Sequence, residues 1–270
     1  MIAFLREVSP RLEGCELMHV ARRPIDLKLA RTQHAQYAKV LGELGVTVEF
    51  VPALSEQPDG VFVEDTAVLL PELALIGRPG AASRVPEVET IAAVLAHYPP
   101  VHRIGGDATL DGGDVLPIGR TLFVGRSGRT NAGGIAALAK IVEPFGYVVH
   151  AVEIDGCMHL KTACTFVPPH FLVTNTSWVQ PTAFGDLSVI PVDESDPFSA
   201  NTLTLAGTTL VSASCPRTEL RLREAGIATR RVEISEFEKA EGGLTCLSLM
   251  LEPRSKHADR AGGARRHPNT

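Results

Sequence analysis

The sequence predicts an α/β repeat fold in which five similar units close into a ring, as in a propeller. Polar residues recur along the chain at nearly even intervals, since Asp65, Asp111, His159, Asn201 and Cys246 are separated by 46, 48, 42 and 45 residues. Each stands at or just before an apolar run with the character of a β-strand. Equivalent positions in a ring of repeats lie around one axis, so we expect these five side chains to meet.

The apolar runs come in pairs that predict β-hairpins. The paired runs are residues 66–70 with 73–77, 114–118 with 121–125, 162–167 with 171–174, and 202–205 with 208–211. The fifth run, 245–251, has no second strand after it. The N-terminal segment can supply the missing strand, from either Ala3–Leu5 or Leu17–Val20. Closing the ring with both ends of the chain also removes exposed sheet edges.

A helix followed by a further strand links one hairpin to the next. Tyr37, Val40, Leu41 and Leu44 show the spacing of one helix face, and Gly45 supplies a left-handed residue after it. Three more segments have the same helical pattern: 86–97, 131–145 and 216–225. The strands that follow are 46–51, 101–104, 147–150 and 229–234. The predicted unit is therefore strand, strand, helix, strand.

Composition favours one large enzyme-sized domain. The chain has 270 residues, of which 44% are apolar, and the repeat predicts a single catalytic domain over 1–253. The polar, Arg-rich segment 254–270 has no periodicity, and we expect it to be disordered. The net charge of −5 gives no reason to expect a nucleic-acid partner. The five irregularly spaced cysteines, with no visible signal peptide or membrane span, indicate reduced thiols in the cytoplasm.

A thiol, an imidazole and a carboxylate share the same phase of the repeat. Cys246 follows two glycines and begins a strand, His159 lies in Met-His-Leu-Lys, and Asp111 begins Asp-Gly-Gly-Asp. Taken singly, each has a purely structural explanation, as a small buried residue or a turn residue. Together they form a set in which a base activates a thiol and an acid orients the base. Asp114 competes with Asp111 for the acidic role, and we favour Asp111.

Acidic and basic residues in the same regions suggest an arginine-like ligand. Asp59, Glu64 and Asp65 lie within seven residues, and clustered carboxylates call for a cation between them. A metal ion or a guanidinium group would serve. Arg84 and Arg129 follow Gly-containing turns and could hold a carboxylate through paired hydrogen bonds. Several acids for a cation and two arginines for an anion indicate a small-molecule zwitterion as substrate.

Six motifs resemble those of dimethylarginine dimethylaminohydrolases, over about Leu17 to Leu251. They are Phe62-Val-Glu-Asp, Arg78-Pro-Gly-Ala-Ala-Ser-Arg, Leu110-Asp-Gly-Gly-Asp-Val, Val124-Gly-Arg-Ser-Gly-Arg-Thr-Asn, His159-Leu-Lys and Gly242-Gly-Leu-Thr-Cys-Leu-Ser. This family belongs to a guanidine-modifying superfamily that also contains arginine deiminases and amidinotransferases. The resemblance implies a five-bladed α/β propeller with pseudo-fivefold symmetry. It also implies hydrolysis of Nω-methylated arginine to citrulline and an alkylamine, without a cofactor or a metal.

The resemblance further implies roles for individual residues. Cys246 would be the nucleophile, His159 the general acid and base, and Asp111 the carboxylate beside the histidine. Asp65 would bind the substrate guanidinium, with Glu64 next to it.

The remaining implied roles concern the other end of the substrate. Arg84 and Arg129 would bind its carboxylate. Asp59 would hold its α-amino group, together with the main-chain carbonyls of Leu17 and Ala240. Nothing in the motifs decides between a monomer and a homodimer.

Other functions stay open on the sequence alone. An arginine deiminase would release ammonia from unmethylated arginine, and an amidinotransferase would pass the amidino group to another amine. Cys157, His159 and Cys164 could contribute to a zinc site, although they lack the paired spacing of structural zinc ligands. A noncatalytic arginine-binding protein on the same fold is a further alternative.

Overall fold

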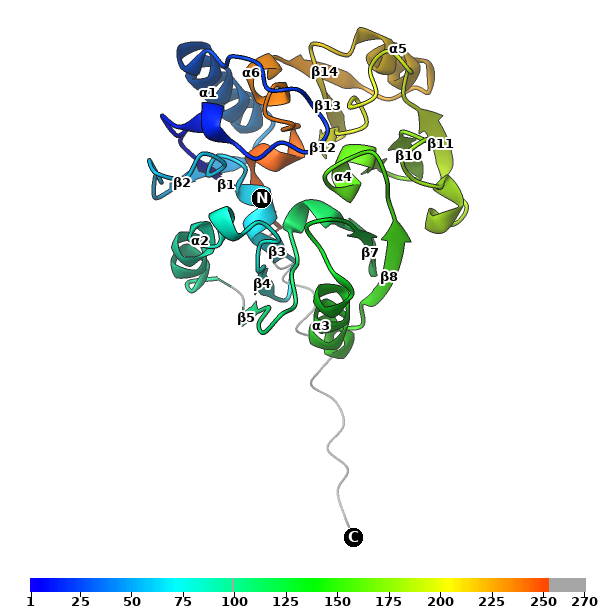
Figure 1. The fold of residues 1–270 in the computed structure, drawn as a ribbon. Coiled ribbons are helices and arrows are strands. Elements are labelled where there is room, and N and C mark those ends of the chain that lie inside the picture. The colour runs from blue at the N-terminus through cyan, green and yellow to red at the C-terminus, as the bar shows by residue number, and fades with distance from the viewer. Residues whose placement is uncertain (99, 253–270) are drawn as a thin grey trace.

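Five three-stranded sheets surround a central axis like the blades of a propeller (Figure 1). The structure is a computed structural model, and it describes residues 1–98 and 100–252. The predicted five-bladed α/β propeller is confirmed. The segment 254–270, for which disorder is expected, lies outside the described residues.

Each blade repeats one strand arrangement. In the first, β3 (Ala67–Leu69) pairs antiparallel with β4 (Ala74–Ile76), and β4 pairs parallel with β5 (Val101–Arg103). The next three blades are β6 (Val115–Ile118), β7 (Thr121–Arg126) and β8 (Val148–Glu153); β9 (Cys164–Val167), β10 (Phe171–Thr174) and β11 (Ser188–Pro191); and β12 (Leu203–Leu205), β13 (Thr208–Ser212) and β14 (Thr229–Val232). Among the first strands, β9 contacts both β6 and β12, so these strands line the axis side by side.

The two ends of the described chain build the fifth blade together. β15 (Leu249–Leu251) pairs antiparallel with β1 (Ile2–Arg6), and β1 pairs parallel with β2 (Thr47–Val51). Of the two candidates for the closing strand, Ala3–Leu5 is therefore the correct one. Residues 17–20 form a loop instead, and that loop lies beside the candidate active site.

Four longer helices cover the periphery of the ring (Figure 1). They are α1 (Leu27–Glu43), α2 (Glu87–Leu95), α3 (Ala132–Val142) and α5 (Pro216–Glu224); α4 (Leu160–Ala163) and α6 (Ser235–Glu238) are single turns. α1 begins well before the predicted segment, because the Asp26 side chain accepts hydrogen bonds from the amides of Lys28 and Leu29. None of the helices in 1–98 and 100–252 has the length and apolar character to cross a membrane.

One blade departs from the predicted unit. Between β10 and β11 the connection contains a short 3-10 helix, Pro181–Phe184, where other blades have an α-helix. A proline at its start and Gly185, with a positive φ of 75°, at its end restrict it to this length. Further 3-10 helices are Leu12–Gly14, Val63–Thr66, Ala82–Arg84, Gly112–Asp114, Glu143–Phe145 and Thr245–Leu247. Several of these turns present the candidate site residues.

Candidate active site

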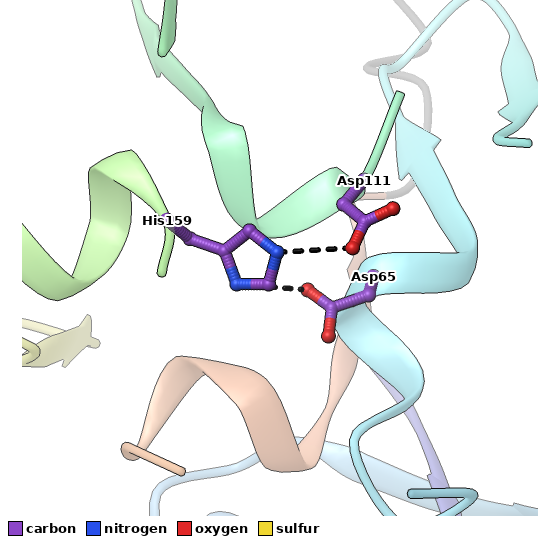
Figure 2. A group of neighbouring side chains, drawn as sticks. All are labelled: Asp65, Asp111 and His159. Atoms are coloured by element: carbon purple, nitrogen blue, oxygen red, sulfur yellow. Dashed lines mark hydrogen bonds and ion pairs between the residues drawn. The ribbon is translucent and has the colours of Figure 1, made fainter. Parts of the chain in front are cut away.

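An imidazole between two carboxylates forms the centre of the site (Figure 2). His159 Nε2 lies 3.0 Å from Asp111 Oδ2, and His159 Nδ1 lies 3.6 Å from Asp65 Oδ1. Asp65 belongs to the 3-10 turn 63–66, Asp111 caps the turn 112–114, and His159 caps α4. Three blades thus bring together residues that are 46 and 48 positions apart in sequence. The repeat predicts this contact.

The backbone fixes both carboxylates. Gly80 N donates to Asp111 Oδ1 at 2.9 Å, and Gly113 N donates to Asp65 Oδ1 at 3.2 Å. A Cβ at Gly113 would lie 2.6 Å from Asp65 Oδ1 and 2.9 Å from the His159 ring. Because Gly113 has no Cβ, its backbone can lie close to the imidazole of His159 and donate the hydrogen bond that fixes Asp65.

The two acids favour the protonated form of the ring. Burial lowers the pKa of His159, but the charge of Asp65 and the hydrogen bond with Asp111 raise it more, to about 9. Burial also raises the pKa of Asp65, yet the positive charges of His159 and Arg84 lower it to about 2. At neutral pH the centre of the site is an imidazolium beside the ionised Asp65, which suits a general acid.

Cys246 lies in the turn 245–247 and is 7% exposed. Its Sγ accepts a hydrogen bond from Gly243 N at 3.3 Å. Burial, followed by the charges of Glu64 and Asp65, raises the pKa of the Cys246 thiol above its ordinary value. The thiol is therefore protonated in the ligand-free protein, and formation of the thiolate requires an additional positive charge nearby.

A buried polar network links Glu64 to the cysteine turn. Glu64 accepts hydrogen bonds from Lys161 Nζ at 2.5 Å and from Thr245 Oγ1 at 2.7 Å. Asn201 Nδ2 donates to Thr245 Oγ1 at 3.1 Å, and Asn201 Oδ1 accepts from Thr245 N at 2.9 Å. Asn201, the fourth periodic residue, therefore supports the turn that carries Cys246.

Lys161 and Thr245 have no role predicted from the sequence. Thr245 directly precedes Cys246 and Lys161 lies two positions after His159, so the motifs around the predicted residues are the signal that could have found them.

Arg84 has partners different from those expected. Its side chain is 3% exposed and forms ion pairs with Asp65 and with Glu87, the latter at 2.8 Å. Its Nη2 also donates to the carbonyls of Phe62 at 2.9 Å and Asp59 at 3.3 Å. In this arrangement Arg84 neutralises Asp65, and its guanidinium donates to protein acceptors. Glu87, three positions after Arg84 in the sequence, therefore takes up part of the arginine's charge that was expected to bind the substrate carboxylate.

Arg129 is placed where it could bind an anionic group of a ligand. It is 5% exposed, and its Nη1 is buried without a hydrogen-bond partner in 1–98 and 100–252. An unpaired guanidinium N–H in a buried position is costly unless a ligand accepts from it. Of the two predicted carboxylate-binding arginines, the geometry favours Arg129.

The groups expected at the substrate amino end also lie near the site. Asp59 is buried, and both its oxygens accept from Glu16 N at 3.2 Å. Burial raises the pKa of Asp59 to about 6, against the lowering effect of Arg84. Leu17 is half-buried next to Glu16, and Ala240 is 4% exposed beside the cysteine turn.

The rival candidate Asp114 has a structural role. Its Oδ2 accepts from Ser127 Oγ at 2.6 Å and its Oδ1 accepts from Leu160 N at 2.9 Å. It thereby fixes the residue after His159 without touching the ring as closely as Asp111 does. This agrees with the choice of Asp111 for the site.

The proposed zinc ligands do not converge through their side chains. Cys157 Sγ donates to the carbonyl of His159 at 3.4 Å, while the His159 ring faces Asp65 and Asp111. The side chains with metal-ligand geometry are instead Asp65, Asp111 and His159, whose atoms lie within 4.8 Å of one another. Arg84 and the imidazolium already balance these carboxylates.

Comparison with known proteins identifies the family. Residues 52–184 match the family model for arginine deiminase. A dimethylarginine dimethylaminohydrolase of Streptomyces coelicolor is 40% identical over 253 residues, which cover 92% of this chain and 96% of that protein. The chain belongs to the dimethylarginine dimethylaminohydrolase family. It is thus a hydrolase of the class that acts on C–N bonds of linear amidines.

Further dimethylarginine dimethylaminohydrolases agree in sequence and in structure. The protein of Pseudomonas aeruginosa is 31% identical over 240 residues, covering 88% of this chain and 94% of that one. A solved cysteine-to-serine variant from P. aeruginosa, complexed with citrulline, superposes with a TM-score of 0.87 at 30% identity, covering 92% and 98% of the two chains. A histidine-to-glycine variant, solved as an adduct with S-methyl-L-thiocitrulline, gives a TM-score of 0.86 with the same identity and coverage.

Proposed function

We propose that the protein hydrolyses Nω-methylated arginines, asymmetric dimethylarginine and monomethylarginine, to citrulline and an alkylamine through a covalent intermediate on Cys246. The observation that carries this proposal is the imidazolium of His159, held between Asp111 and Asp65. The same site contains a protonated thiol and Arg129, whose Nη1 has no hydrogen-bond partner among the described residues. Such a site carries a proton for a leaving group and has places for both charges of an arginine-like substrate. The relatives complexed with citrulline and with a thiocitrulline support the same substrate class.

Substrate binding supplies the positive charge that the thiol lacks. The guanidinium binds near Asp65 and Glu64, whose charges otherwise raise the pKa of Cys246. The carboxylate of the substrate binds Arg129. The α-amino group of the substrate binds Asp59 and the carbonyls of Leu17 and Ala240. With the cation in place the thiol loses its proton to solvent, and the thiolate attacks the guanidinium carbon.

His159 acts first as an acid and then as a base. Its imidazolium protonates the departing alkylamine as the C–N bond breaks, which leaves an S-alkylthiouronium on Cys246. The neutral ring then takes a proton from water as the water oxygen adds to the same carbon. Breakage of the C–S bond releases citrulline and regenerates the thiolate. Asp111 keeps the ring oriented for both steps.

In this mechanism Arg84 acts through its ion pair with Asp65. By holding the pKa of Asp65 low, it keeps that carboxylate ionised for the substrate. Direct binding of the substrate carboxylate by Arg84 would require its guanidinium to leave Asp65 and Glu87.

The test is citrulline formation from asymmetric dimethylarginine, monomethylarginine and arginine, with amine and ammonia release measured separately. Cys246→Ser should abolish turnover. Cys215→Ser is the matched control, because Cys215 precedes α5, where serine is a favourable N-cap. Citrulline and ammonia from arginine alone would assign the protein to the deiminase branch, whose family model also matches 52–184. Absence of citrulline with all three substrates would refute the proposal.

A further inference from the structure

The buried side chain of Glu241 holds the loop 17–20 beside the site. Its Oε1 accepts hydrogen bonds from three successive backbone amides: Met18 N at 2.9 Å, His19 N, and Val20 N at 2.6 Å. Successive amides that converge in this way form an anion-binding concavity. Here the chain fills that concavity with its own carboxylate.

The backbone of Glu241 is in an unfavourable conformation. Its φ of 56° lies in the left-handed region, which residues with a Cβ adopt at a cost and glycine adopts freely. Two glycines follow directly, at 242 and 243, yet the left-handed position itself carries a glutamate. Such an outlier points to a function for its side chain.

The three hydrogen bonds fix the direction of the Leu17 carbonyl. Leu17 C=O and Met18 N–H belong to one peptide group, and in a trans peptide these two groups point in opposite directions. Since Met18 N–H points to Glu241, the Leu17 carbonyl points away from it. Glu241 therefore orients one of the two carbonyls expected to bind the substrate amine.

The main chain of Glu241 fixes the second carbonyl by the same geometry. Glu241 N donates to Glu238 O at 3.2 Å, so the Ala240 carbonyl in the same peptide group points the opposite way. Gly242 N donates to Phe237 O at 2.8 Å and closes the turn. One residue thus links the backbone at Leu17 to the backbone at Ala240, although they are 223 positions apart.

We propose that Glu241 is a positioning residue that sets the two main-chain carbonyls for the α-amino group of the substrate. This inference rests on the proposed function and extends it to substrate discrimination. Removing Glu241 should weaken binding of ligands that carry an α-amino group, and should leave the chemistry at Cys246 and His159 in place.

Two further features concern the other carboxylate oxygen of Glu241. Its Oε2 is buried without a hydrogen-bond partner in the part of the chain that the structure describes. The residue lines a cavity of about 240 Å³ together with Val20, Asn201 and Gly243, and Leu17 and Ala240 are not among the described residues that line it. The contribution of Glu241 to amine binding is therefore the placement of the two carbonyls and not a direct contact through Oε2.

The loop 17–20 also reaches the opposite side of the site. A Cβ at Gly128 would lie 3.1 Å from Met18 Cε, so the Met18 side chain rests on the turn that carries Arg129.

The decisive variant is Glu241→Gly, because glycine suits the backbone conformation and the fold should keep its thermal stability. We expect KM for monomethylarginine to rise about 10-fold or more, because a set of charge-assisted hydrogen bonds is lost. We expect kcat to stay within about threefold of the wild-type value. Hydrogen exchange at the amides of residues 18–20 should accelerate. Glu241→Gln, which keeps an acceptor oxygen, should fall between the wild type and the glycine variant.

The matched control is Glu238→Gln. Glu238 lines the same cavity and accepts from Ser212 Oγ, with no hydrogen bond to the loop, so its change should leave KM and exchange at 18–20 unaltered. The second readout is the des-amino analogue 5-(N′-methylguanidino)pentanoic acid, for which Glu241→Gly should change KM less than about threefold.

Each result has a defined meaning. An unchanged KM in Glu241→Gly, or an equal rise for the substrate and its des-amino analogue, would overturn the role of Glu241. Unchanged exchange at 18–20 would overturn the positioning of the loop, whatever the substrate is. Failure of the wild type to release citrulline would instead refute the proposed function, and the exchange experiment would still decide whether Glu241 holds the loop.

Discussion

Nearby carboxylates raise the pKa of both His159 and Cys246, but the retained proton makes the histidine charged and leaves the cysteine neutral. Asp65 and Asp111 raise the pKa of His159 to about 9, which favours its charged form. Burial and the charges of Glu64 and Asp65 raise the pKa of Cys246, which favours its neutral form. The ligand-free site thus has its acid ready and its nucleophile inactive. A cationic substrate would lower the pKa of the thiol, so that the reaction depends on the ligand being bound.

The largest effect is expected from removing the proton carrier. His159→Ala should lower turnover of methylated arginine by about 10²- to 10⁴-fold, the usual contribution of general acid and base catalysis. Some covalent labelling of Cys246 should persist, because attack by the thiol precedes the need for an acid. Mass spectrometry of the intact protein and citrulline release measure the two separately. His150→Ala is the control, since His150 is exposed on β8. Normal turnover in His159→Ala would remove His159 from the mechanism.

A positively charged ligand should lower the pKa of the cysteine, whereas a neutral ligand of the same shape should not. On rapid mixing, asymmetric dimethylarginine should raise the ultraviolet absorbance of the thiolate at neutral pH, and citrulline should leave it nearly unchanged. A pKa lower by about two units increases the thiolate fraction about 100-fold while the thiol predominates. Cys246→Ser should abolish the signal. A thiolate signal already present without ligand would contradict the comparison.

Asp65→Asn should move both sides of the site in the same direction. Loss of this charge lowers the pKa of His159 and the pKa of Cys246, each by about one unit for a close charged neighbour. The pH dependence of Cys246 alkylation reports the thiol, and NMR titration of the ring reports the imidazole. Asp193→Asn is the control, because Asp193 pairs with Arg217 and Arg221 in another part of the molecule. Opposite shifts of the two groups would refute a shared electrostatic cause.

The smallest effect concerns stability. A histidine whose pKa rises from about 6.5 in the unfolded chain to about 9 in the folded protein stabilises the fold most fully below pH 6.5. Its contribution should be lost as the pH rises from about 6.5 to 9, at about 1.4 kcal/mol per pH unit at most. Thermal denaturation across this range should show the slope in the wild type and in His150→Gln, and a smaller slope in His159→Gln. Equal slopes in all three proteins would show that other groups dominate.

The period of the sequence accounts for most of what could be predicted. Asp65, Asp111 and His159 were expected to meet because they hold equivalent places in successive units, and they do. The same logic gave the closing strand at Ala3–Leu5 as one of two candidates. The connection at 181–184 is a short 3-10 helix instead of an α-helix because of one proline and one glycine. The spacing of the repeat carries no information about such single residues.

The period of the sequence does not predict the separate roles of the two arginines. Arg84 and Arg129 each follow a Gly-containing turn, and nothing in those turns separates their roles. Arg84 pairs with Asp65 and Glu87 because all three side chains are buried in one place, where unpaired charges are costly. Arg129 Nη1 has no hydrogen-bond partner among the described residues, although the charge of Arg129 helps to lower the pKa of Asp65.

The sequence by itself determined the ring of five units, the turns that begin each blade and the convergence of the periodic residues, since these depend on spacing and on local backbone preference. Only the tertiary structure decided which charge neutralises which, and that Glu241 holds the loop 17–20 from 221 or more positions away. The physical reason is that ion pairs and hydrogen bonds act over a few ångströms in space. A repeat fixes which segments approach the axis, but the packing of individual side chains fixes which atoms meet there.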